Sequence, residues 1–283
     1  MATFTNFATL SYSGGTTNSN TVVGELLETL SVSKAAVSSD YSAGDDITYV
    51  VSLINSGTAA LSGLTVTDDL GGYQFDGETV YPLRYTTGSV RYYVNGALQA
   101  APAVVEGPPM VISGITVPAG GNAVLVYEAD VTAFAPLVSG AEITNVATVS
   151  GGGLSAPISA SETVTAQDRA ELTVSKALNP AVVTENGQLT YTFVIENSGN
   201  VEATVADDVV LRDTFDPILD DITVTYNGTV WTEEVNYTYD RTTGEFATLP
   251  GQITVPAAEY IRNSDGTWTV SPGTASLSIT GTV

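Results

Sequence analysis

LSVSKAAVSSDYSAGDDITYVVSLINSG, at residues 30–57, is the stretch that decides the fold, because it recurs as LTVSKALNPAVVTENGQLTYTFVIENSG at residues 172–199. The two stretches align without a gap at an offset of 142 positions (172 − 30) and share LxVSKA, TY and NSG. Three more pairs follow in the same order: GLTVTDDL (63–70) with VVLRDTF (209–215), VRYYVNGA (90–97) with ITVTYNGT (222–229), and AVLVYEADV (123–131) with ASLSITGTV (275–283). Such self-similarity indicates a tandem duplication of one domain.

Each copy alternates apolar and polar residues over short segments, and the segments are separated by turn signals such as SAGDD, NSG, VNG and PAGG. Alternation of period two with this spacing predicts an all-β fold of two tandem immunoglobulin-like β-sandwich domains. We expect the chain to divide into four parts. They are an N-terminal donor strand and linker (1–28), a complete domain (29–150), a linker with room for one exposed strand (151–170) and an incomplete domain (171–283).

Composition excludes several classes of function. The formal net charge is −23, which disfavours nucleic acid and anionic membranes as partners, and no apolar run is long enough to span a membrane. The chain has no Cys and no His, so disulfides, thiolate catalysis and imidazole chemistry are absent. No phosphate-binding glycine loop occurs either. We therefore expect no enzyme activity and no cofactor or metal, and the N-terminus shows no signal peptide.

The opening of the chain looks like the end of a domain. FTNFATLSYS at residues 4–13 shares its pattern with ITNVATVS at 143–150, the last strand of the first copy, whereas the second copy stops at ASLSITGTV. We expect the N-terminal strand to complete the second domain of a neighbouring molecule, with Phe4, Asn6, Ala8 and Leu10 as the inward face. Burying Phe4 and Leu10 would contribute about 3–6 kcal/mol before ordering costs. A head-to-tail contact of this kind gives an open filament; the alternative is that the segment folds back into its own second domain.

The two lysines of the chain occupy equivalent positions, and the alternation places both on inward faces. Lys34 follows Leu30 and Val32, and Lys176 follows Leu172 and Val174. A buried unpaired ammonium costs several kcal/mol, so each lysine needs a partner. The same alternation turns Asp68, Asp213, Asn145 and Asn6 inward on neighbouring segments.

A buried Lys, an acid and an Asn are the requirements of a spontaneous isopeptide bond. Burial favours the neutral amine, which attacks the Asn amide while the acid shuttles protons and ammonia leaves. We expect Lys34, Asp68 and Asn145 to form one trio within the chain. Lys176, Asp213 and the next molecule's Asn6 would form the other. The alternatives are a plain buried ion pair with a hydrogen-bonding amide, and Asp69 in place of Asp68 as the acid.

Taken together, LxVSKA, TY, NSG, VxxTDxL and ITNVATV resemble the conserved repeat domain of bacterial and archaeal surface proteins, known as domain of unknown function eleven. The resemblance covers almost the whole chain and implies a non-enzymatic surface or appendage module. Two-repeat chains of this size also resemble filament subunits of endospore appendages. The sequence thus predicts a structural subunit of an extracellular or spore-surface filament, a homopolymer whose anchoring partner it does not identify.

Two other functions remain open, in both of which the protein would not polymerise. One is an adhesive or ligand-binding module that uses exposed aromatics, from among Tyr81, Tyr85, Tyr92, Tyr93, Trp231, Tyr237 and Tyr239. The other is a spacer stiffened by calcium at the acidic pairs Asp45-Asp46, Asp68-Asp69, Asp207-Asp208 and Asp220-Asp221. None of these pairs has the ligand spacing of a known calcium loop.

Overall fold

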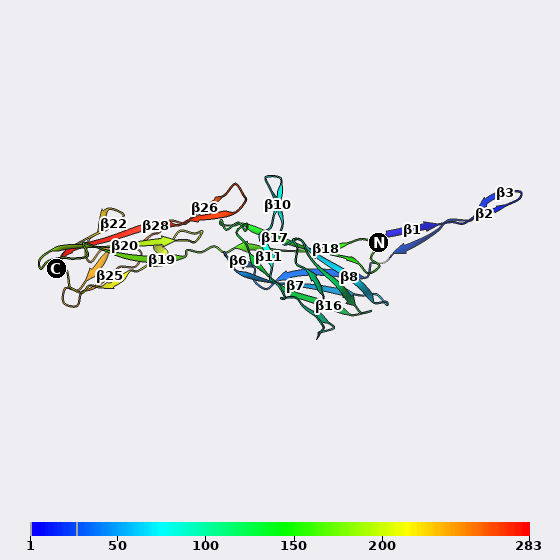
Figure 1. The fold of residues 1–283 in the computed structure, drawn as a ribbon, viewed down its shortest axis with the longest axis horizontal. Coiled ribbons are helices and arrows are strands. Elements are labelled where there is room, and N and C mark those ends of the chain that lie inside the picture. Colours follow the sequence, from blue (N-terminus) through cyan, green and yellow to red (C-terminus); the bar gives the residue numbers. More distant parts are fainter. Residues whose placement is uncertain (1, 27) are drawn as a thin grey trace.

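The computed structural model describes residues 2–26 and 28–283, which form an N-terminal arm and two β-sandwich domains arranged along one long axis (Figure 1). The all-β prediction is confirmed, since the regular elements of the described residues are strands and one short 3₁₀ helix, Val205–Asp207. The arm lies at one end of the molecule and the C-terminus at the other.

The first domain packs two six-stranded sheets face to face. One sheet has the order β13-β12-β16-β7-β5 with β11 beside β16, and the other has the order β14-β15-β8-β17-β18-β6. The strands are β5 (Leu30–Ala36), β6 (Asp40–Tyr41), β7 (Asp46–Asn55), β8 (Leu61–Asp68), β11 (Leu83–Tyr85), β12 (Arg91–Val94), β13 (Ala97–Leu98), β14 (Ala103–Val105), β15 (Met110–Val117), β16 (Asn122–Val131), β17 (Glu142–Gly151) and β18 (Ile158–Ala166). A hairpin of β9 (Tyr73–Phe75) and β10 (Glu78–Val80) projects from the domain (Figure 1).

Alternation along the strands builds the core. In β7 every second side chain, Ile47, Tyr49, Val51 and Leu53, is buried between the sheets. The neighbouring strand β16 of the same sheet does the same, and its Tyr127 stacks on Tyr49 with ring centroids 5.7 Å apart. Because successive side chains of a strand point to opposite faces, the sequence pattern determines which face of each strand is apolar.

The second domain repeats the first sheet of this architecture. Its order β19-β20-β28-β22-β23 reproduces β5-β7-β16-β12-β13 strand for strand. The strands of this domain are β19 (Leu172–Asn179), β20 (Gln188–Asn197), β21 (Arg212–Thr214), β22 (Asp220–Tyr226), β23 (Thr229–Val230), β24 (Tyr237–Tyr239), β25 (Glu245–Thr248), β26 (Glu259–Arg262), β27 (Trp268–Ser271) and β28 (Gly273–Thr282).

Equivalent hydrogen bonds support the duplication. Asn55, the Asn of the first NSG, is fully buried, and its side chain donates to the Ala59 carbonyl at 2.8 Å and accepts from the Gly57 amide at 2.9 Å. Asn197 of the second NSG makes the same two bonds, to Val201 and Gly199, at 2.8 and 2.9 Å. Both turns therefore depend on the same buried amide.

The second sheet of the second domain is half built. Its order β21-β25-β24 corresponds to β8-β15-β14, and no described strand takes the positions of β17, β18 and β6. The prediction that this domain lacks the last strand is confirmed, and the gap is wider than the one strand expected. The stretch 151–170, expected as a linker with room for one exposed strand, contains β18, which belongs to the first domain and has Val164 and Ala166 buried.

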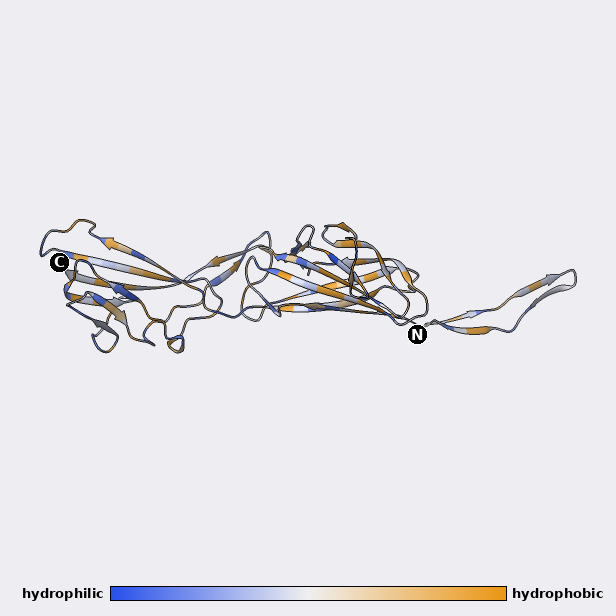
Figure 2. Ribbon diagram, turned by 90° about the horizontal axis from the view of Figure 1, so that it is seen from below, coloured by the Kyte–Doolittle hydropathy of each residue, from blue (hydrophilic) through white to orange (hydrophobic). Residues whose placement is uncertain are grey.

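The N-terminal arm is a hairpin, whereas a single strand was expected. β1 (Ala2–Asn6) pairs with β4 (Val22–Leu26), and β2 (Thr9–Tyr12) pairs with β3 (Gly15–Asn18). Phe4 and Leu10 are 57% and 64% exposed, and hydrophobic positions run along the projecting arm (Figure 2). The arm thus presents apolar side chains to solvent that a folded chain would ordinarily bury.

A cation held among aromatic rings joins the two domains. Arg262, at the end of β26, lies 4.0 Å from the ring centroid of Phe75 in β9 and 5.5 Å from that of Trp268 in β27. The Trp268 amide donates to the Ala133 carbonyl of the first domain at 2.9 Å. The β26–β27 hairpin of the second domain therefore rests on the β9–β10 hairpin of the first.

We expect Arg262→Ala to loosen this joint, because each desolvated cation–π contact contributes about 0.5–2 kcal/mol. Small-angle X-ray scattering of the unpolymerised chain should then show a broader distribution of interdomain distances. Arg91→Ala, at an exposed position of β12 in the first domain, is the control and should leave the scattering profile unchanged. Identical profiles for both variants would show that Arg262 does not hold the joint.

Candidate functional site

The first domain holds a buried ion pair that bridges its two sheets. Lys34 on β5 donates from Nζ to Oδ2 of Asp68 at the end of β8, at 2.5 Å. The two side chains are 0% and 1% exposed. Lys34 reaches the core because it shares the inward face of β5 with Leu30, and Asp68 follows the buried Leu64 and Val66 along β8.

Aromatic rings surround this pair. The Lys34 ammonium lies 4.7 Å from the ring centroid of Tyr49, and the Tyr127 hydroxyl donates to the same Asp68 oxygen that Lys34 contacts. Burial lowers the pKa of Lys34, an effect that the Asp68 carboxylate opposes. The neutral amine is therefore available at a lower pH than for a solvated lysine.

Asn145 on β17 is the third member expected at this site. It is fully buried, and neither polar atom of its amide has a hydrogen-bond partner among the described residues. Ala147, two positions along the same face, lies opposite Asp68 in the β17–β8 register. Burial raises the pKa of Tyr49, and the neighbouring Asn145 amide partly offsets this rise. An unsatisfied buried amide costs about 1–3 kcal/mol, so the presence of Asn145 in this core requires an explanation.

Asp69, considered as an alternative acid, is engaged elsewhere. Its Oδ1 accepts from the backbone amides of Gly71 at 3.0 Å and Val146 at 2.9 Å. These bonds fix the turn after β8 and tie it to β17. Asp68, rather than Asp69, makes the contact with Lys34.

The second domain contains the same pair in an open setting. Lys176 on β19 donates to Asp213 on β21, and its Nζ lies 4.4 Å from the ring centroid of Tyr191. The Lys176 and Asp213 side chains are 40% and 18% exposed. Nothing described in this domain occupies the place of β17 and its Asn.

Asn6, expected to complete that second trio, lies on the arm at the opposite end of the molecule from the second domain (Figure 1). It is exposed, as are Phe4, Ala8 and Leu10. Within one chain the structure therefore brings together Lys34, Asp68 and the strand of Asn145, and brings Lys176 to Asp213, but it does not bring Asn6 to either.

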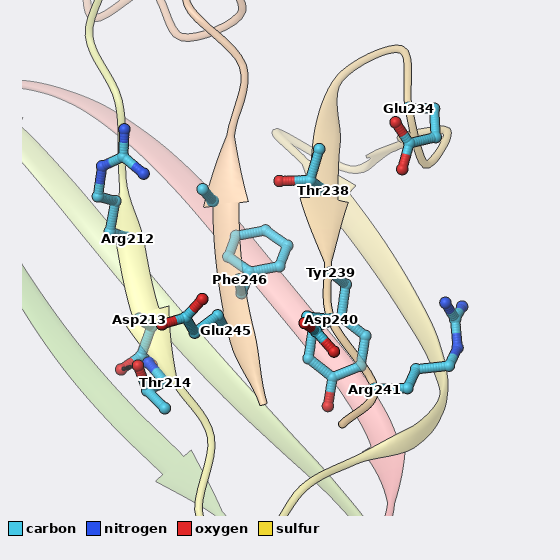
Figure 3. A pocket seen from close by; sticks show the side chains of 11 residues that line it. Arg212, Asp213, Thr214, Glu234, Thr238, Tyr239, Asp240, Arg241, Glu245 and Phe246 are labelled. Atoms are coloured by element: carbon cyan, nitrogen blue, oxygen red, sulfur yellow. Dashed lines mark hydrogen bonds between the residues drawn. The ribbon is translucent and has the colours of Figure 1, made fainter. Parts of the chain in front are cut away.

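A hollow of about 700 Å³ lies over the three strands β21, β25 and β24. Figure 3 shows Arg212, Asp213 and Thr214 along β21, beside Phe246 of β25 and Tyr239 of β24. On the side of β21 away from β25, no described strand pairs with it. The hollow thus adjoins the incomplete edge of the sheet.

The aromatic residues considered for adhesion and the acidic pairs considered for calcium binding do not form binding sites among the described residues. Of the seven aromatics considered for adhesion, Tyr85, Tyr92, Tyr237 and Tyr239 are buried and Tyr81, Tyr93 and Trp231 are half-buried, so they form no exposed platform. In the part of the chain that the structure describes, no three acidic, His or Cys side chains gather as a metal site would require. The described residues also include no helix that could cross a membrane.

Tyr127 is the site residue that we did not single out from the sequence. The alternation of AVLVYEADV turns Leu125, Tyr127 and Ala129 to the core, which is the signal that could have identified it. Its counterpart in the second copy, ASLSITGTV, is Ile279. The second acid therefore lacks the hydroxyl that the first one has.

Comparison with known proteins gives a distant likeness to surface proteins. No protein-family model and no curated protein matches the chain. The pilus backbone protein of Streptococcus pneumoniae matches at 14% identity and a TM-score of 0.35, over 87% of this chain and 55% of that one, so the chain spans about half its length. The major pilin subunit of Bacillus cereus matches at 14% and 0.37, over 96% and 73%. The collagen-binding domain of a Staphylococcus aureus adhesin matches at 11% and 0.32, over 50% and 99%. The resemblance to the conserved repeat family stays a prediction.

We expect the two lysines to differ sharply in their contribution to stability. Lys34→Met leaves Asp68 buried without its partner, which should destabilise the first domain by about 3–5 kcal/mol. Lys176→Met removes a partly exposed pair, so the cost in the unpolymerised chain should be ~1 kcal/mol or less. Scanning calorimetry measures both, and the fluorescence of Trp231 and Trp268 reports the second domain separately. Equal losses would contradict the difference in burial.

Proposed function

We propose that this protein is a structural subunit that polymerises head to tail into an extracellular or spore-surface filament. The proposal rests on the difference between two equivalent sites: the first domain has a Lys, an Asp and a covering strand with an Asn, and among the described residues the second domain has only the Lys and the Asp. Lys176 and Asp213 are in contact at a sheet edge that no described strand covers, whereas the equivalent Lys34 and Asp68 are covered by a strand bearing Asn145. The sequence pattern of that strand, β17, recurs at residues 4–11 of the arm, where the side chains are exposed.

Docking follows the template of the first domain. Phe4, Asn6, Ala8 and Leu10 of one molecule would take the places that Ile143, Asn145, Ala147 and Val149 take on β17. β17 pairs with β8 through Ala147↔Asp68, so Ala8 would lie opposite Asp213. An uncovered strand edge invites an added strand, since its backbone groups need partners.

The position of the arm supports donation between molecules rather than within one. The arm leaves the far end of the first domain, and the incomplete sheet lies in the domain at the other end (Figure 1). Hydrogen bonds made by the described residues of the arm stay within the arm. A fold-back would have to carry the arm past the whole first domain.

Docking would place Asn6 beside Lys176, and the filament would then be locked covalently. The neutral Nζ amine attacks Cγ of the Asn amide, the new Nζ–Cγ bond forms, and the bond from Cγ to the amide nitrogen breaks. The departing nitrogen takes a proton from the attacking amine through the aspartate and leaves as ammonia. Asp213 would shuttle this proton between molecules, as Asp68 would for Lys34 and Asn145 within the first domain.

We expect a ladder of bands that survives boiling in denaturant, and peptides in which Lys176 and Asn6 are joined with loss of one ammonia. Asn6→Ala should abolish the ladder and leave the ammonia loss within the first domain intact. Thr5→Ala, at the adjacent position on the opposite face of the strand, should keep the ladder. A monomer band with no ammonia loss in the wild-type chain would exclude crosslinks in both domains.

Asp213→Asn should slow the intermolecular crosslink by about 10²–10⁴-fold, because it removes the proton shuttle without removing the docking strand. Filaments should still form and be visible by electron microscopy, but should dissolve on boiling. The bond between Lys34 and Asn145 in the same chains serves as the internal control. If both bonds form at the wild-type rate, Asp213 does not shuttle the proton.

A further inference from the structure

We infer that the arm docks as a two-stranded hairpin, and that its returning strand β4 covers β19 of the neighbouring molecule. This inference rests on the proposed function and specifies the interface. The donated unit would then fill two empty positions of the second domain, those equivalent to β17 and β18.

The first domain supplies the template for this contact. β17 and β18 form an antiparallel hairpin in which Asn145 lies opposite Glu162 and Ile143 lies opposite Val164. β17 pairs with β8, while β18 runs alongside β5, the edge strand of the other sheet. One strand of the hairpin thus extends a sheet, and the other closes the side of the sandwich.

The β1–β4 part of the arm resembles this hairpin around the Asn. Asn6 lies opposite Val22, 16 positions later (22 − 6), and Asn145 lies opposite Glu162, 17 positions later (162 − 145). Phe4 lies opposite Gly24, as Ile143 lies opposite Val164. The β1–β4 pairing around Asn6 therefore corresponds to the β17–β18 pairing around Asn145, with one residue fewer between the paired positions, so a docked arm would bring β4 to the place of β18.

Side-chain volumes show that the two strands of the arm form one unit. A Cβ atom at Gly24 would lie only 2.3 Å from the Phe4 ring, so the ring occupies the space that a side chain at position 24 would need. In the first domain, the equivalent positions hold two medium-sized side chains, Ile143 and Val164. Phe4 and Gly24 fill a core position jointly, because core packing depends on total volume.

The acceptor surface is the uncovered flank of β19. In the first domain, Val32 and Ala36 of β5 are partly buried and pack against the core. Their counterparts Val174 and Leu178 are 62% and 41% exposed. β19 pairs only with β20 among the described strands, so its other side lacks the cover that β18 gives to β5.

Single-cysteine variants of the full chain test the inference, because the protein has no Cys of its own. We expect the Val174→Cys thiol to react with a maleimide at least about tenfold more slowly in filaments than in free chains, since it would react only through local opening. Ser175→Cys is the matched control, because its counterpart Ser33 stays exposed in the first domain. Its labelling rate should not change on assembly.

A second measurement identifies the covering strand. Chains with Val22→Cys mixed with chains with Val174→Cys should be joined by a short bis-maleimide, whereas Val23→Cys, on the opposite face of β4, should not. Unprotected Val174→Cys in filaments that carry the Lys176–Asn6 bond would overturn the hairpin and leave donation of a single strand standing. Absence of both the ladder and the filaments would overturn the proposed function and this inference together.

Discussion

A lysine in the core of a β-sandwich is the constraint on which the rest of this structure depends. An ammonium held between two sheets is stable only with a compensating partner such as a carboxylate beside it. Lys34 meets that requirement by crossing from one sheet to Asp68 on the other, among the rings of Tyr49 and Tyr127. The strand that seals the pair from water, β17, is therefore part of the lysine's environment as well as of the sheet.

In the second domain the equivalent lysine lacks, among the described strands, the hairpin that corresponds to β17 and β18. Lys176 keeps its aspartate and its aromatic neighbour, but solvent reaches it and the flank of β19 is bare. The exposed pair is tolerable because water solvates the side that β17 covers in the first domain. In the proposed filament, the apolar side chains of the arm and those of β19 would form the two sides of one contact.

Much of this arrangement follows from the sequence, because a period of two reports which face of a strand each residue takes. The repeat predicted the sandwiches, and the alternation turned Lys34 and Asp68 toward the same core. Periodicity does not report which strand pairs with which, so it predicts 151–170 as a linker with one exposed strand, and not as the buried partner of β17, and it predicts the arm as a single strand. The hairpin of the arm depends on Gly24 leaving room for Phe4, a relation between residues distant in sequence. Tyr127 was missed for the same reason, since its partner lies on the other sheet.

Besides the missing strands, the two copies diverge where they touch. The β9–β10 hairpin has no counterpart in the second domain, where only a short turn joins β21 to β22. The β26–β27 hairpin has none in the first, where Pro118–Gly121 joins β15 to β16. These two additions meet at Arg262, whose guanidinium lies 4.0 Å from the ring centroid of Phe75 and 5.1 Å from that of Tyr73. The core and its lysine are common to both copies, whereas each hairpin of the joint belongs to one copy. In the proposed filament, the polarity of head-to-tail addition would come from the arm at one end of the molecule and the incomplete sheet at the other (Figure 1).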